Sequence, residues 1–116
     1  MRRLMREQQV LVPRLEVADT LRTRNKGLLG RDSLPADQAL WILQCSSVHT
    51  FFMRFKIDLV FLNSKMVVTR IAKRVPPGRL VLNFFSAASV IELSEGFLDK
   101  QPIRVGEKLH VDPAVS

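Results

Sequence analysis

One stretch of this chain decides the fold, and it reads His49-Thr50-Phe51-Phe52-Met53-Arg54-Phe55-Lys56-Ile57-Asp58-Leu59-Val60-Phe61. Four phenylalanines in thirteen positions, followed by a run of β-forming side chains, are typical of strands buried on at least one face. Asp58 stands between Ile57 and Leu59, and a buried carboxylate without a partner costs a large amount of free energy. The stretch therefore predicts a buried strand and, near Asp58, donors that satisfy its carboxylate.

Outward from this stretch, β-forming runs recur at short intervals, separated by polar turns such as Asn63-Ser64, which predicts an antiparallel hairpin. The helices that would connect parallel strands in a doubly wound sheet are missing from the pattern. We expect a mainly β fold, a single-domain β-sandwich or partly open barrel of about 6–8 short strands with one or two short helices. The expected strands cover residues 10–17, 39–43, 48–53, 57–62, 66–75, 80–83, 88–93 and 108–111.

The clearest helix signal follows the first expected strand. Asp19 or Thr20 can cap a helix that runs to about Leu29, and Gly30 can take the left-handed conformation that ends it. Gly27, inside this segment, lowers helix stability by about 1 kcal/mol relative to alanine, which indicates close packing at that position. A second, single helical turn is expected at residues 96–100.

The composition is that of an ordinary soluble globule of 116 residues, 47% of them hydrophobic and 25% charged. We expect residues 1–9 to form a flexible basic tail and residues 10–116 to form a single β domain. The one cysteine, Cys45, excludes an internal disulfide and fits a reducing compartment. Neither a leader nor a membrane span is evident, so we expect a cytoplasmic protein, or a periplasmic or secreted one if a leader has been removed.

The net charge is +7, from 18 Lys and Arg residues against 11 Asp and Glu residues. Such a balance favours acidic partners, including nucleic acid. The basic residues, however, are spread along the chain, and no nucleic-acid module is recognisable. A solvated basic surface is therefore the preferred interpretation, and nucleic acid is not the expected partner.

Two carboxylates, Asp58 and Glu92, are the main candidate site residues, because both lie within apolar strands. Each could be a structural group that accepts backbone hydrogen bonds or pairs with an arginine. Alternatively, the two could meet in a pocket, where mutual repulsion would raise one pKa and suit acid–base chemistry. Arg24 and Arg31 flank the segment 27–30 and could either brace these carboxylates or grip an anionic ligand.

Cys45 and His49 are spaced as C-x3-H, and a thiol nucleophile activated by histidine needs the two side chains within hydrogen-bond reach. The preferred interpretation of Cys45 is a small buried hydrophobic residue. With one cysteine and two histidines the chain lacks the usual ligand set of a structural zinc site, and we expect no metal and no cofactor. Phe52 and Met53 are candidates for the apolar wall of a pocket near His49.

Four motifs follow one another along the chain: Arg24-x-x-Gly27-Leu28-Leu29-Gly30-Arg31, His49-Thr50-Phe51-Phe52-Met53-x-x-x-Ile57-Asp58-x-x-Phe61, Val90-Ile91-Glu92-Leu93-x-x-Gly96 and Val105-Gly106-Glu107. Together they resemble the DUF192 family, also called UPF0127, over about residues 17–111. The resemblance implies a compact, mainly β domain in which Arg24, Arg31, Asp58 and Glu92 form one polar constellation; it implies no particular activity. Cys45 lies outside the family's pattern, and Phe52 stands where the family often has tryptophan.

These observations favour a non-enzymatic module that binds a small ligand, a peptide or a partner protein at one end of the β fold. Its polar groups would come from Arg24, Arg31, His49, Asp58 and Glu92, and its apolar wall from Phe52 and Met53. One alternative is a small hydrolase-type enzyme that uses the carboxylate pair, or Cys45 with His49. Another is a basic interaction module for nucleic acid or for a secretion or pilus assembly.

Overall fold

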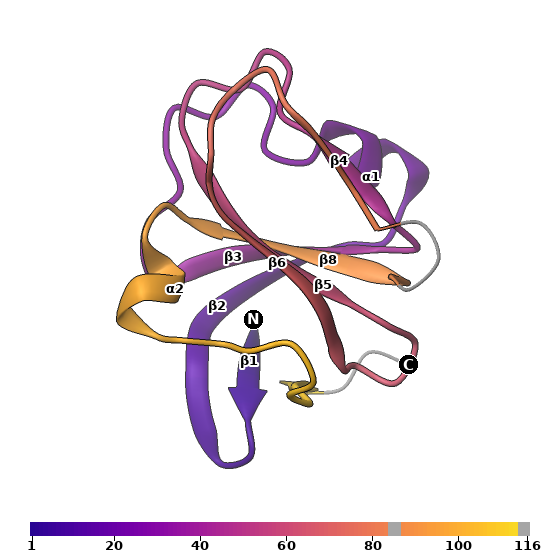
Figure 1. The fold of residues 1–116 in the computed structure, drawn as a ribbon, viewed down its shortest axis with the longest axis vertical. Coiled ribbons are helices and arrows are strands. Elements are labelled where there is room, and N and C mark those ends of the chain that lie inside the picture. The colour runs from indigo at the N-terminus through magenta and orange to yellow at the C-terminus, as the bar shows by residue number, and fades with distance from the viewer. Residues whose placement is uncertain (84–86, 114–116) are drawn as a thin grey trace.

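The computed structural model describes residues 1–83 and 87–113, and its dominant element is one twisted sheet (Figure 1). Seven strands form this sheet in the order β6-β5-β8-β3-β2-β1-β9. Strands β2 and β3 run parallel, whereas the other neighbouring pairs are antiparallel. The strands are β1 (Arg2–Arg6), β2 (Gln9–Ala18), β3 (Gln38–Leu43), β5 (Ile57–Leu62), β6 (Val68–Val75), β8 (Ser89–Ser94) and β9 (His110–Asp112).

A second, smaller sheet pairs β4 (Ser47–His49) with β7 (Leu80–Leu82). Residues 1–83 and 87–113 also form two helices, α1 (Leu21–Lys26) and α2 (Phe97–Lys100). The expected mainly β class is confirmed, although the described residues contain nine strands where about 6–8 were expected. In the described part of the chain, neither helix is long and apolar enough to cross a membrane.

The large sheet stays open, but it curls enough for its two ends to meet. Val67, just before β6, forms an isolated bridge with Lys108, just before β9. The backbone N–H of Val68 also donates to the carbonyl of Glu107, at 2.8 Å. The sheet is therefore not closed into a barrel by a continuous ladder of hydrogen bonds. A short backbone contact joins its two edge regions instead.

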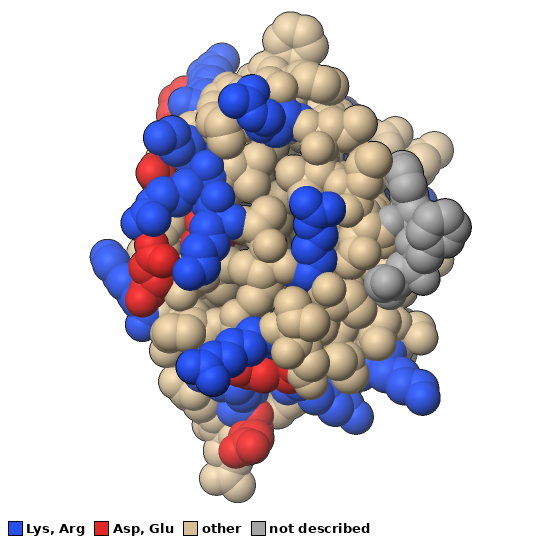
Figure 2. Space-filling view, in the orientation of Figure 1, with Lys and Arg blue, Asp and Glu red and all other residues tan. Residues whose placement is uncertain are grey.

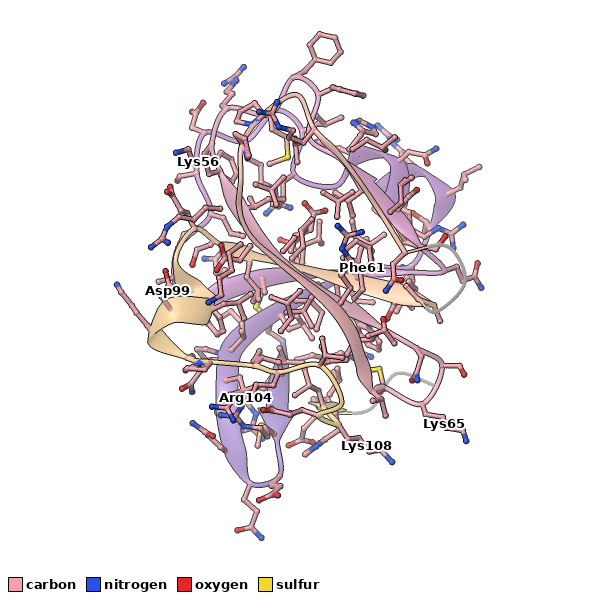
Figure 3. The ribbon with its side chains drawn as sticks, viewed as in Figure 1. Lys56, Phe61, Lys65, Asp99, Arg104 and Lys108 are labelled. Carbon is pink, nitrogen blue, oxygen red and sulfur yellow. The ribbon has the colours of Figure 1, made fainter. Side chains whose placement is uncertain are left out.

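Alternating side chains of the central strands build two apolar cores, one on each face of the large sheet. Along β5, Val60 and Leu62 belong to one, here called the β1-side core, which also contains Leu4 of β1. Leu59 and Phe61 belong to the other, here called the α1-side core, and Figure 3 shows Phe61 in the interior of the molecule. All six residues of β5 are buried, Asp58 included, in agreement with the buried strand predicted from this stretch.

The N-terminal segment is part of the sheet, so the prediction of a flexible tail at residues 1–9 is wrong. Strand β1 pairs with β2 on one side and with β9 on the other. Leu4 is fully buried and Met5 is 8% exposed. Two apolar side chains anchor an otherwise basic segment, because burying them removes apolar surface from water.

Helix α1 begins where the sequence predicts and ends earlier. Thr20 is its N-cap, and Thr20 and Thr23 form a reciprocal capping box. The helix ends at Gly27, whose φ of 50° and ψ of −128° leave the helical region, and not near Leu29 as expected. A short helix with no buried residue of its own therefore lies on the surface of the α1-side core.

Candidate functional site

A pocket with a volume of about 420 Å³ lies between α1 and β4, over the α1-side face of the large sheet. Helix α1 and the turn after it form one wall, and the segment 45–49 forms the opposite wall. Ile42 of β3 and Glu92 of β8 reach the pocket from the large sheet. Four of the seven residues proposed from sequence line it, namely Arg24, His49, Met53 and Glu92.

Glu92 brings a buried carboxylate to this pocket, and it is only 2% exposed. No side chain or backbone N–H in residues 1–83 and 87–113 donates a hydrogen bond to it. Burial raises the pKa of Glu92 from 4.5 to about 7, while the positive charge of Arg31 acts in the opposite direction. The carboxyl group therefore changes between its neutral and ionised forms near neutral pH.

The backbone turn at Gly27 makes room for this carboxylate. A Cβ atom at position 27 would lie 3.2 Å from Oε1 of Glu92, which is tighter than ordinary van der Waals contact. The φ of 50° at Gly27 also belongs to the region that side-chain-bearing residues rarely adopt. Gly27 thus both ends α1 and lets the chain pass close to Glu92, in line with the close packing expected there.

The two arginines near the end of α1 have different partners. Arg24 lines the pocket, and its Nη1 donates to Oε1 of Gln44 at 2.9 Å, which links α1 to the end of β3. Arg31 forms an ion pair with Glu16 at 2.7 Å and acts on Glu92 through its charge alone. Within residues 1–83 and 87–113, neither arginine therefore forms an ion pair with Asp58 or Glu92.

Asp58 has a structural role on the opposite face of the sheet. It is fully buried and accepts hydrogen bonds from the backbone N–H groups of Arg74 and Leu98, both at 2.9 Å, and of Gly96 at 3.4 Å. It thereby joins β6 to the first turn of α2. In the β5–β8 pairing, Asp58 lies opposite Leu93, which belongs to the β1-side core. Glu92 lies opposite Leu59, which belongs to the α1-side core. The two carboxylates therefore lie on opposite faces of the sheet, and the alternative in which they meet in one pocket is not formed.

Cys45 and His49 line the same pocket, but they do not form a nucleophile–base pair. The Cys45 thiol donates to the carbonyl of Ser47 at 2.9 Å, and the His49 ring stacks on Phe51 with centroids 5.5 Å apart. Burial and the nearby charge of Glu92 raise the pKa of the Cys45 thiol, whereas an activated thiol needs a lowered one. Within the described residues, no three Cys, His, Asp or Glu side chains gather in a metal-binding arrangement.

The two candidate wall residues separate at a tight turn after β4. Met53 is 7% exposed and lines the pocket. Phe52 is 91% exposed, with a φ of 66°, so its ring points away from the pocket and its assignment to the wall is wrong. The turn is held by Thr50, whose hydroxyl donates to the carbonyl of Pro76 and accepts from the N–H of Arg79.

A second hollow, of about 440 Å³, lies at the turn between β1 and β2 and beside the segment 107–110. Its charged residues already satisfy one another, since Arg6 forms an ion pair with Glu107 at 2.9 Å and also donates to the carbonyl of Pro102. None of the buried polar or charged residues of the described chain lines this hollow, whereas Glu92 lines the pocket beside α1. The pocket beside α1 is therefore the stronger candidate.

Sequence reasoning missed the polar residues of the opposite wall, above all Gln44, Ser46 and Ser47. A signal for them exists, because a polar run, Gln44-Cys45-Ser46-Ser47, interrupts two apolar strands. The run by itself is also typical of an ordinary loop. Only the placement of α1 beside it makes it a wall of the pocket.

The fold and this pocket define a small, mainly β protein with a buried acidic group beneath its first helix. The sequence profile of DUF192, described as "Uncharacterized ACR, COG1430", matches residues 3–111, and the chain belongs to this family. The UPF0127 protein of Thermococcus sibiricus (strain DSM 12597 / MM 739) is 29% identical over 109 residues, which cover 87% of this chain and 68% of that protein.

Two crystal structures have the same fold at low sequence identity. A protein of unknown function from Novosphingobium aromaticivorans DSM 12444 matches with a TM-score of 0.76 and 20% identity, over 83% of this chain and 73% of that one. A "putative transcription regulator" from Sinorhizobium meliloti 1021 matches with a TM-score of 0.79 and 17% identity, over 95% and 91%. At such identities the likeness concerns the fold alone.

Proposed function

We propose that this protein is a non-enzymatic binding module that takes a polar ligand in the pocket between α1 and β4. One observation carries the proposal: Glu92 is 2% exposed, reaches the pocket, and receives no hydrogen bond from the described residues. Burial of Glu92 disfavours its ionised form, and a hydrogen bond to a charged group contributes about 1.5–3 kcal/mol of free energy. A ligand that donates an N–H or O–H to Glu92 would recover this free energy.

The charges around the pocket narrow the class of ligand. Arg24 and Lys26 also line it, from α1. A matching ligand therefore combines a hydrogen-bond donor for Glu92 with an anionic or strongly accepting group for the α1 side. The volume of about 420 Å³ lies within the range of small-molecule sites, roughly 300–1,000 Å³.

The alternatives have less support. A hydrolase would need either the carboxylate pair, which lies on opposite faces of the sheet, or an activated Cys45, whose pKa is raised. On the face in Figure 2, Lys and Arg side chains lie interspersed with Asp and Glu along one side and do not form a continuous basic stripe. A binding module agrees best with these observations.

The test is a thermal-shift screen at pH 7.5 with amino acids, dicarboxylates, sugar acids and neutral sugars, followed by calorimetric titration of the hits. We expect a hit to lose at least tenfold in affinity with Glu92→Gln and with Arg24→Gln. Glu95→Gln is the matched control, because Glu95 is exposed and lies outside the pocket. A screen without any stabilising compound, or hits that bind Glu92→Gln unchanged, would contradict the proposal.

A further inference from the structure

Strand β4 has a hydrogen-bonded neighbour on one side only within the described residues. It belongs to a two-stranded sheet with β7, in which Ser47 faces Leu82 and His49 faces Leu80. An unpaired strand edge presents backbone N–H and C=O groups that can pair with another chain. The first question is therefore which backbone groups of β4 point to this edge.

Two backbone hydrogen bonds that flank β4 show which of its backbone groups point toward β7. The N–H of Asn83 donates to the carbonyl of Ser46 at 2.9 Å, and the N–H of Thr50 donates to the carbonyl of Arg79 at 2.8 Å. In an antiparallel pair, hydrogen-bonded and non-bonded positions alternate, so Val48 also bonds to β7. The backbone groups of the two positions between, 47 and 49, consequently point away from β7.

Among the described residues, most of these outward groups have no hydrogen-bond partner. The carbonyl of Ser47 accepts the Cys45 thiol at 2.9 Å. The N–H of Ser47 and both backbone groups of His49 bond to no described residue outside the β4–β7 pairing. All four residues from Ser46 to His49 line the pocket, so the free edge of β4 faces the same space as Glu92.

From this geometry we propose that the pocket binds an extended peptide segment, which adds to β4 as a third strand and directs a donor group to Glu92. The proposal rests on the function proposed above and names its ligand class. Free backbone groups two residues apart repeat every ~7 Å, which matches the backbone of another strand and few small molecules. Because β4 spans three residues, the paired part of the peptide is about three residues long.

The closing experiment uses synthetic heptapeptides selected from a random library on the intact protein. Each selected peptide is remade in two forms, N-methylated on alternate amides, so that one form blocks each edge of the bound strand. We expect one form to lose at least tenfold in affinity while the other keeps it. Equal affinity of both forms would overturn the proposal, because a peptide that pairs with β4 along one edge must lose affinity when the amides of that edge are methylated.

Amide hydrogen exchange supplies an internal control. Peptide binding should slow exchange at Ser47 and His49 at least tenfold and leave Val48, which is already bonded, unchanged. If small ligands bind through Glu92 but no peptide is selected, the peptide inference fails and the pocket function stands. If peptides protect β4 yet bind Glu92→Gln with full affinity, the strand pairing stands and the proposed role of Glu92 fails.

Discussion

Two carboxylates in neighbouring strands, Asp58 and Glu92, have different surroundings in this fold. Asp58 accepts hydrogen bonds from backbone N–H groups. Glu92 faces a pocket, and no described residue donates a hydrogen bond to it. Both were recognisable from sequence as charges within apolar strands, since that needs only local context. That they point to opposite faces was not recognisable, because it depends on the register between β5 and β8.

Replacing the structural carboxylate should cost much more stability than replacing an exposed one. Asp58→Asn puts an amide against backbone N–H donors and leaves at least one of them unsatisfied, so we expect a loss of about 3 kcal/mol in unfolding free energy. Urea denaturation measures it. Asp32→Asn is the control, because Asp32 pairs with Arg54 on the surface and should change stability by less than about 1 kcal/mol. Equal losses would show that the buried bonds are unimportant.

Glu92 should make stability fall as pH rises toward neutrality. Its pKa is raised from 4.5 to about 7 in the folded protein, so below pH 4.5 both states are protonated and the stabilisation is fully present. Between pH 4.5 and 7 the unfolded chain loses the proton first, and about 3 kcal/mol of unfolding free energy is lost by pH 7.5. The difference between wild type and Glu92→Gln, measured in urea across this range, should show that decline.

The matched control is Glu95→Gln, because Glu95 is exposed and lies outside the pocket. A flat difference for Glu92→Gln would mean that the carboxyl group is solvated in solution.

At the scale of elements, the turn after α1 couples helix geometry to the pocket. Its cap at Thr20 was predictable because capping is a local interaction between neighbours in sequence. The early end at Gly27 was not, because the reason is the approach of the turn to Glu92 from a distant strand.

Alanine substitutions at two glycines of this turn distinguish the effect of backbone strain from that of crowding beside Glu92. Gly27→Ala and Gly30→Ala should each lower the unfolding free energy by about 1–2 kcal/mol, since both positions have positive φ. Only Gly27→Ala should also raise the pKa of Glu92, because its methyl group would fill the space beside Oε1. Carbon-13 NMR of the Glu92 carboxyl group follows the titration. An equal response in both variants would contradict this coupling.

At the scale of the whole molecule, the N-terminal strand completes the seven-stranded sheet. Leu4→Ala should therefore lower the unfolding free energy by about 3 kcal/mol, through lost burial and the cavity left behind. Val10→Ala, at a position 39% exposed, should cost less than about 1 kcal/mol. Chemical denaturation of both variants tests this, and equally small effects would restore the flexible-tail interpretation.

Local patterns in the sequence determined the β-rich class, the buried strand at 57–62, the helix cap and the need of Asp58 for donors. Period-two alternation and capping act between near neighbours, so they can be read directly. The tertiary structure alone decided that β1 joins the sheet and that Asp58 and Glu92 lie on opposite faces of it. It also decided that α1 and β4 enclose a pocket. Those outcomes depend on which distant segments pair and in which register, and that is settled by the free energy of the assembled cores.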